Sequence, residues 1–210
     1  MTLQHDIDLQ AVKVMGILNV TPDSFSDGGK FTHVDNALAQ VSKMISDGAN
    51  IIDIGGESTR PGALDVNEQD ELARVIPLLK MIKNNFTIDV SIDTSKAKVM
   101  EQAILHGADI INDVRALQND NCLAVVAQSK LPVCLMHMQG QPRTMQHSPQ
   151  YDNLIDDIKN FFYQRIEACQ QVGIEESRVI LDPGFGFGKT LAQNYELLNK
   201  LAEFKHFNLP

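Results

Sequence analysis

Short apolar runs rich in β-branched residues alternate with longer stretches of helical periodicity along the whole chain. The short runs predict strands that begin near Lys13, Asn50, Thr87, Asp109, Pro132 and Arg178. The longer stretches predict helices at about 34–47, 68–84, 96–106, 119–129, 151–172 and 191–204. The strand starts are about 33 residues apart, the size of one βα unit, so the pattern predicts six such units with parallel strands.

A polar residue closes almost every predicted strand. These residues are Asn19, Asp53, Asp93, Asn112, His137 and Asp182. A (β/α)8 TIM barrel gathers such strand ends at one mouth, whereas an open sheet that binds a dinucleotide carries G-x-G-x-x-G after its first strand. The sequence from Asn19 to Asp23 (NVTPD) has no such motif. We therefore predict an α/β fold, a single (β/α)8 barrel domain over residues 1–210 with only six of its eight βα units present.

Composition excludes several classes of function. Eighteen Lys and Arg against 27 Asp and Glu give a formal charge of −9, the wrong sign for a nucleic-acid binder. No stretch approaches the ~18 apolar residues of a membrane span, and the start of the chain carries acids where a signal peptide carries Lys or Arg. We expect a cytoplasmic protein. The three cysteines lie far apart, which disfavours a disulfide or zinc site, and we expect Cys134 to be a buried strand residue.

Two polar loops follow the first two predicted strands. Residues 19–29 (NVTPDSFSDGG) have low helix and strand propensity, and a loop of this kind can close over a ligand. Residues 55–62 (GGESTRPG) combine glycines with Arg60, whose guanidinium can form paired hydrogen bonds with phosphate oxygens. A surface turn is the alternative for each loop, but their place at the predicted mouth favours ligand binding.

Asp93, Asn112 and Asp182 would bring two carboxylates and an amide to the same mouth. Carboxylates accept paired hydrogen bonds from planar N–H donors. The three residues therefore suit a flat nitrogen heterocycle with an amidine-like edge. Helix capping is the alternative for each of them.

The segment Asp182–Thr190 (DPGFGFGKT) is not a phosphate-binding P-loop, because that motif requires glycine where Pro183 stands. We expect a flexible loop whose Phe185 and Phe187 can line a pocket. No residues with metal-ligand spacing surround His137, so we expect it to be a hydrogen-bonded residue of the mouth.

Five segments, in order along the chain, resemble the dihydropteroate synthase family of pterin-binding enzymes. They are residues 19–29, 53–62, 91–94, 111–114 and 181–189 (NVTPDSFSDGG, DIGGESTRPG, SIDT, INDV and LDPGFGFGK). The resemblance implies a barrel that joins 4-aminobenzoate to 7,8-dihydropterin-6-ylmethyl diphosphate and releases diphosphate. It also implies that Mg2+ assists the leaving group, that sulfonamides inhibit the enzyme and that the enzyme is a homodimer.

The same resemblance implies roles for individual residues. Pterin binding is assigned to Thr59, Asp93, Asn112, Met136, Asp182 and Phe187; aminobenzoate binding to Phe25, Pro61 and Gly62; catalysis to Asp27 and Arg60; and the magnesium contact to Asn19. A diphosphate attached through such a methylene group can ionise early. The enzyme's task would then be to stabilise the separating charges.

The chain departs from the family at its end. Family members continue into a seventh strand with a Ser-Arg-Lys segment and an eighth with Arg-x-His, which supply cations to the pterin and the diphosphate, whereas this sequence stops at Pro210. We therefore expect residues 1–210 alone to lack synthase activity. Two alternative functions stay open: a methyltetrahydrofolate:corrinoid methyltransferase, which needs no diphosphate loop, and a noncatalytic pterin-binding module.

Overall fold

The computed structural model describes residues 12–20, 30–58, 65–141, 144–146 and 148–210. Its strands are β1 (Met15–Asn19), β2 (Ile51–Gly55), β3 (Asp89–Asp93), β4 (Ile110–Asp113), β5 (Val133–Met136) and β6 (Val179–Asp182). All are parallel, and each pairs with the next along the chain. This is the strand order of a (β/α)8 barrel, so the predicted fold class is confirmed.

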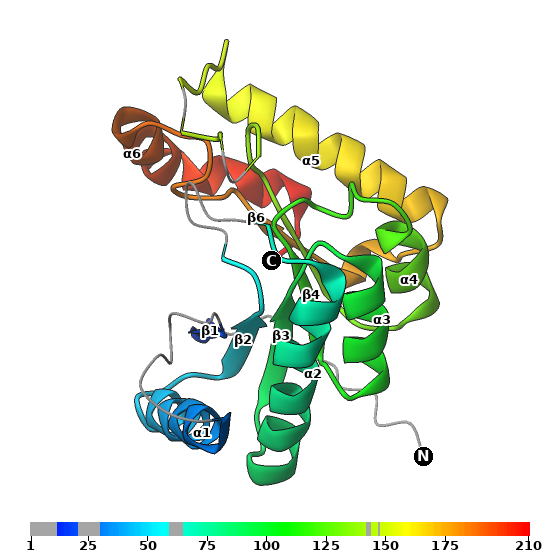
Figure 1. Cartoon of the computed structure of the whole chain (residues 1–210). Helices are drawn as coiled ribbons and strands as arrows, with labels where there is room; N and C mark the ends of the chain where they lie inside the picture. Colours follow the sequence, from blue (N-terminus) through cyan, green and yellow to red (C-terminus); the bar gives the residue numbers. More distant parts are fainter. Residues whose placement is uncertain (1–11, 21–29, 59–64, 142–143, 147) are drawn as a thin grey trace.

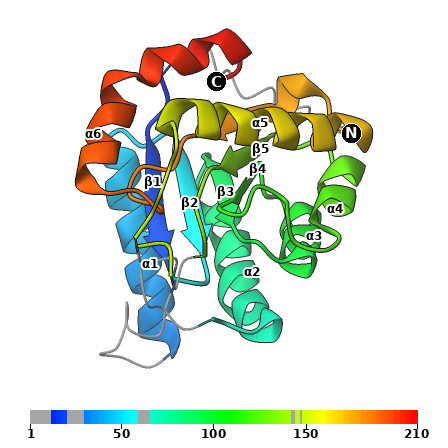
Figure 2. The same ribbon diagram turned by 90° about the horizontal axis from the view of Figure 1, so that it is seen from above.

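A helix follows each strand and covers the outer face of the sheet. The helices are α1 (Lys30–Ser46), α2 (Glu68–Asn85), α3 (Ala97–Leu105), α4 (Cys122–Gln128), α5 (Leu154–Gln171) and α6 (Leu191–Asn199). They form an arc around the strands, with α1 and α6 at its two ends (Figure 1). In Figure 2 the arrows of β1 and β2 point the same way, as expected for parallel strands.

Three predicted helix boundaries are wrong. Helix α1 begins at Lys30 rather than near residue 34. Helix α4 begins only at Cys122, because Asn121 has a φ of 64° and cannot belong to a right-handed helix. The predicted helix at 191–204 is two elements: α6 ends at Asn199, and a 3-10 helix, η3, follows at Leu201–Phe207.

Alternate strand residues face opposite sides of the sheet, and the outward set builds two apolar clusters. The first cluster contains Leu18, Ile52, Ile54, Val90 and Ile92 with residues of α1, α2 and α3. The second contains Ile111, Val133, Leu135 and Val179 with residues of α4, α5 and η3. Burial of these side chains against helices is the main force that holds the sheet and helices together. Cys134 is buried on β5, as predicted, and none of the cysteines is in a disulfide.

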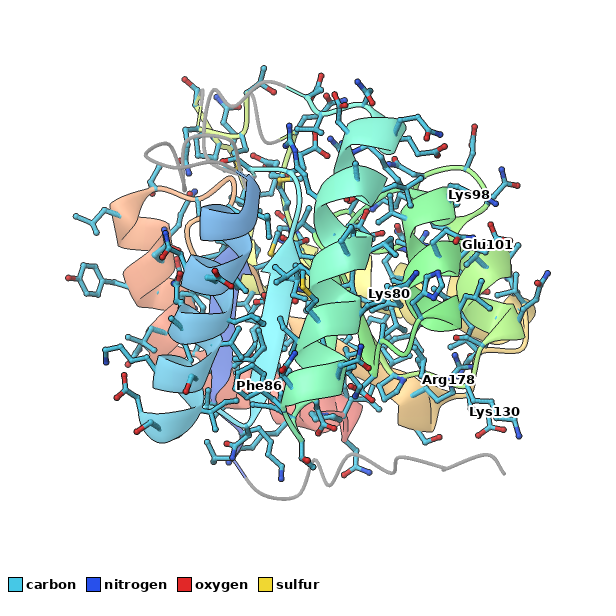
Figure 3. All side chains as sticks on the ribbon, turned by 60° about the horizontal axis from the view of Figure 1, so that its bottom comes forward. Lys80, Phe86, Lys98, Glu101, Lys130 and Arg178 are labelled. Atoms are coloured by element: carbon cyan, nitrogen blue, oxygen red, sulfur yellow. The ribbon has the colours of Figure 1, made fainter. Side chains whose placement is uncertain are left out.

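The amino-terminal ends of the strands are held by hydrogen bonds from cations. Asp109, just before β4, accepts from Lys83 Nζ and from the Val90 N–H, each at 2.7 Å. Arg178 lies just before β6, in a short 3-10 helix, η2 (Glu176–Arg178), and donates to the carbonyls of Leu131 at 2.8 Å and Val126 at 2.9 Å. Figure 3 shows Arg178 near Lys130 at this end of the molecule. In the part of the chain that the structure describes, no helix is long and apolar enough to span a membrane.

Candidate active site

One row of paired residues crosses the sheet where the strands end. It runs through Asn19, Gly55, Asp93, Asn112 and Cys134, each paired with the next. Gly55 contributes no side chain, and a Cβ there would lie 3.1 Å from Asn19 Oδ1 and 3.5 Å from Asp93 Oδ2. The missing side chain thus lets an amide oxygen and a carboxylate oxygen converge over the same space. This row is the floor of the predicted mouth.

A second layer of polar residues lies beneath that floor. Asp53 pairs with Ser91, and both precede the floor residues of their strands by two positions, so they face the same side of the sheet. Asn112 Nδ2 donates to Asp53 Oδ2 at 3.2 Å. Asp53 is only 4% exposed, and neither its Oδ1 nor Ser91 Oγ has a hydrogen-bond partner among the described residues. Because the Asn112 NH2 group donates to Asp53, its Oδ1 is left as an acceptor.

Acids dominate the electrostatics of the floor. Burial raises the pKa of Asp93 well above its ordinary value, and repulsion from neighbouring carboxylates, chiefly Asp53 and Asp113, raises it further. Burial also raises the pKa of Asp53, while the hydrogen bond from Asn112 lowers it. Buried carboxylates are stabilised by N–H donors. The floor therefore favours a ligand that brings several such donors.

Asp182 stands apart from this row, at the end of β6. It pairs with Met136, which is 3% exposed and lies on the strand between it and Asn112. One oxygen, Oδ1, accepts the N–H of Gly184 at 2.8 Å. Burial raises the pKa of Asp182, while that hydrogen bond and the charge of Lys189 lower it.

Helix capping does not account for the three candidate acceptors. The N-cap residues of the helices after β3, β4 and β6 are Lys96, Asn121 and Thr190. The side chains of Asp93, Asn112 and Asp182 are therefore not engaged as caps of these helices and can serve a ligand. The structure places the first two side by side and the third two strands away.

The loop after β6, which we expected to be flexible, has internal contacts centred on Lys189. Lys189 is 2% exposed and donates to the carbonyls of Gly184 at 2.8 Å and Phe187 at 3.0 Å. Its Nζ also lies 3.1 Å from Nδ1 of His137, which is hydrogen-bonded as predicted. Phe187 is half-buried and Phe185 is exposed. The lysine binds its own loop, which agrees with the rejection of a P-loop.

The base of the second loop is tied to the sheet by charge. Glu57 accepts the N–H of Val66 at 2.9 Å, which brings the two ends of this loop together. Lys96 Nζ lies 2.5 Å from oxygens of both Glu57 and Glu71. Phe25, Asp27, Thr59, Arg60, Pro61 and Gly62 lie outside the described residues.

Sequence reasoning gave no role to Ser91, Lys96 or Lys189. Ser91 carried a signal, because it is a polar residue inside an apolar strand and shares a face with Asp93. No sequence pattern marked Lys96 or Lys189 as a functional residue, since their contacts form only in the fold. Asn19 ends β1 as an exposed residue, close to Gly55.

Comparison with known proteins adds a family to this geometry. The family model described as "Pterin binding enzyme" matches residues 15–210. The dihydropteroate synthase of Escherichia coli is 52% identical over 204 residues, which are 97% of this chain and 72% of that protein.

Solved structures agree with the sequence comparison. A Yersinia pestis dihydropteroate synthase in complex with a sulfonamide drug superposes with a TM-score of 0.91 at 55% identity, covering 97% of this chain and 74% of the other. A 7,8-dihydropteroate synthase from Vibrio fischeri is 63% identical with a TM-score of 0.80, over 94% of this chain and 71% of the other. These likenesses span all six βα units.

Proposed function

Since this chain belongs to the dihydropteroate synthase family of pterin-binding enzymes, we propose that the ends of β3, β4 and β6 hold the pterin of its substrate. The chain is a transferase that condenses 7,8-dihydropterin-6-ylmethyl diphosphate with 4-aminobenzoate. This activity takes the place of the two alternatives that the sequence left open, the methyltransferase and the noncatalytic module. The relatives that are about half identical over nearly the whole chain are dihydropteroate synthases, not corrinoid-dependent methyltransferases or noncatalytic modules.

The observation that carries the pterin assignment is the acceptor-rich floor. Asp93 and Asn112 are neighbours in register, and the bond to Asp53 uses the NH2 group of Asn112, which leaves its carbonyl oxygen as an acceptor. A pterin presents an edge of ring and amino N–H groups. Those donors would satisfy the carboxylates of Asp93 and Asp182 and the Asn112 oxygen, and so stabilise charges that burial disfavours. Met136 and Phe187 would form the apolar walls of this pocket.

The aminobenzoate and diphosphate ends follow the resemblance. We assign Phe25, Pro61 and Gly62 to aminobenzoate, Thr59 to the pterin, and Asp27 and Arg60 to catalysis. The ion pair of Glu57 with Lys96 and its bond to Val66 support this part of the proposal, because they hold both ends of the loop that carries Arg60 beside the mouth. The Yersinia pestis relative binds a sulfonamide drug. We expect sulfonamides to bind this chain at the same aminobenzoate end.

Magnesium fits the residues at the end of β1. Asn19 Oδ1 and Asp93 Oδ2 both face the space that a Cβ at Gly55 would fill, and Mg2+ prefers such oxygen donors. Asn19 would hold the ion, with the substrate's own phosphate oxygens as further ligands. Bound there, the ion would offset the negative charge of the leaving diphosphate.

The protein's own residues would then perform three tasks. Asp93, Asn112 and Asp182 fix the plane and rotation of the pterin, so that its methylene group faces the incoming amine. Met136 and Phe187 exclude water from the ring. Arg60 offers a cation where the diphosphate departs. A homodimer and a cytoplasmic location, expected from the family and the sequence, stay predictions.

Replacement of the carboxylates of Asp93 and Asp182 tests this assignment. Asp93→Asn and Asp182→Asn should each weaken binding of the pterin diphosphate by about 1 to 3 kcal/mol, because an amide matches N–H donors poorly. Isothermal titration calorimetry measures the loss. Asp120→Asn, an exposed acid before α4, is the matched control and should bind as the parent does. Parental affinity in both variants would rule out the assignment.

A further inference from the structure

We propose that Lys189 is a positioning residue for the pterin site, which folds residues 182–188 around its ammonium group and thereby sets Asp182 and Phe187 at the mouth. The proposal rests on the proposed function, because it takes Asp182 to bind the pterin. Lys189 would affect the pterin through Asp182 and Phe187 rather than by binding it directly.

Among the described residues, the hydrogen bonds of the Lys189 ammonium lie within its own loop and with His137, just after β5. Its Nζ lies 2.8 Å from the Gly184 carbonyl oxygen and 3.0 Å from that of Phe187. On the other side it meets His137, at 3.1 Å to Nδ1 and 3.4 Å to the backbone oxygen. Lysine is seldom buried without partners, and here backbone acceptors surround it. The ammonium therefore links the loop after β6 to the end of β5.

Two glycines allow the loop to lie this close. Gly184 has a φ of 70°, and a Cβ there would collide with the His137 carbonyl oxygen. Gly188 has a φ of 62°, and a Cβ there would lie 2.5 Å from the carbonyl oxygen of Gln139. At both positions glycine is required by the positive φ and by the lack of space for a Cβ atom. Residues 182–189 thus adopt one shape against β5, and the lysine fills its centre.

The neighbours of the ammonium are arranged to accept from it. His137 packs edge-on against Phe161, with ring centroids 5.0 Å apart. Burial, aided by the charge of Lys189, lowers the pKa of His137 to about 3, so its ring is neutral and its Nδ1 can accept a hydrogen bond. Tyr151, ahead of α5, closes the loop from outside by donating to the Gly188 carbonyl oxygen at 2.7 Å.

Charge gives Lys189 a second effect on Asp182. Burial lowers the pKa of Lys189 to about 8, and Asp182 partly restores it. In return, Lys189 lowers the pKa of Asp182 against the opposing effect of burial. The titratable groups around the ammonium are thus Asp182 from β6, His137 from β5 and Tyr151 from the segment before α5. Of these groups, Asp182 is the one whose carboxylate would accept N–H donors from a pterin.

Lys189→Met tests both effects, since it keeps the apolar stem and removes the donors and the charge. We expect the Kd for the pterin diphosphate to rise about 10- to 100-fold, with the Kd for 4-aminobenzoate within about 2-fold of the parent. The acid limb of pterin affinity, where Asp182 takes up a proton, should also move to higher pH. Lys189→Arg retains the charge but not the fit, so it should lose affinity with its acid limb at the parental pH. Lys200→Met, an exposed lysine after α6, is the control.

The outcomes separate this proposal from the one it rests on. If Asp182→Asn weakens pterin binding while folded Lys189→Met or Lys189→Arg binds as the parent does, the positioning role is wrong and the pterin site stands. If neither Asp182→Asn nor Lys189→Met weakens binding, Asp182 does not bind the pterin, and both the positioning role and that part of the proposed site are wrong. Equal losses for pterin and 4-aminobenzoate, with the acid limb unmoved in Lys189→Met, would mean a general structural role and would also overturn the proposal. If Lys189→Met does not fold, the affinity of Lys189→Arg for the pterin diphosphate tests the positioning role instead.

Discussion

The two ends of the sheet handle buried charge in opposite ways. At the amino ends, Asp109 is paired with Lys83 and also accepts a backbone N–H, and Arg178 donates to two carbonyl oxygens. At the carboxyl ends, burial raises the pKa of Asp53 and Asp93, and buried oxygen atoms of Asp53, Glu71 and Ser91 have no partner within the described residues. One end satisfies its polar groups, and the other leaves them in need of donors.

This difference separates the end of the barrel that stabilises the fold from the end that binds the ligand. Polar groups that are satisfied inside the protein stabilise the fold and have nothing left to offer a ligand. Unsatisfied acceptors destabilise the free protein, but a ligand that supplies donors recovers that free energy on binding. In (β/α)8 barrels the carboxyl ends of the strands carry the chemistry, and the opposite ends serve stability. The charges of this chain follow the same division.

The largest expected effect on stability lies at the amino ends. Arg178→Met should lower the free energy of unfolding by about 2 to 4 kcal/mol, because the carbonyl oxygens of Leu131 and Val126 lose a charged donor. Pterin affinity should not change. Urea denaturation and calorimetry measure the two quantities. Lys130→Met, exposed and close to Arg178 in Figure 3, is the control; a matching loss there would show that charge at this end, rather than the bonds, is responsible.

A smaller loss of stability is expected from Lys96→Met at the mouth. Without the ammonium, the carboxylates of Glu57 and Glu71 face each other unpaired, and Glu71 is fully buried. Unfolding free energy at neutral pH should fall by about 1 to 3 kcal/mol. Burial lowers the pKa of Lys96, but its hydrogen bonds to Glu57 and Glu71 raise it above its ordinary value, so the gap to the parent should narrow only at high pH, where the ammonium loses its charge. A loss of equal size at both pH values would show that packing, and not charge, is what Lys96 contributes.

The smallest effect belongs to the outer surface. Lys98 and Glu101 pair at 2.5 Å on α3, but both are half-exposed and lie on the solvent side (Figure 3). Exposed pairs contribute little, because water and salt screen them. Lys98→Ala should leave the melting temperature and the pterin affinity unchanged. A clear drop in melting temperature would mean that surface charge matters as much as the buried pairs at the two ends.

The sequence predicted the order of the elements better than the contacts of the site. Short apolar runs located all six strands, since the outward face of each strand is buried against helices. The polar strand ends located Asp93 and Asn112 at the mouth, because register follows from parallel pairing. The start of α4 was missed, since a left-handed Asn121 leaves no mark in hydrophobic periodicity. Lys189 was missed for a similar reason: its acceptors are backbone oxygens, which every sequence has.

The central claim is that the mouth keeps buried carboxylates at the expense of stability so that they can bind a pterin, and Asp93→Asn tests it most directly. A carboxyl whose pKa is raised in the folded state takes up its proton at higher pH than in the unfolded chain. Stability therefore falls as pH rises from the unfolded pKa of about 4 through the raised folded value, and it stays lower above that value.

The decisive measurement is the free energy of unfolding of the parent and of Asp93→Asn across this pH range, with pterin affinity measured on the same samples. The account predicts that the variant is more stable than the parent at neutral pH, that this advantage shrinks on acidification, and that the variant binds the pterin diphosphate more weakly. A variant that is less stable at neutral pH and binds the pterin as tightly as the parent would contradict it.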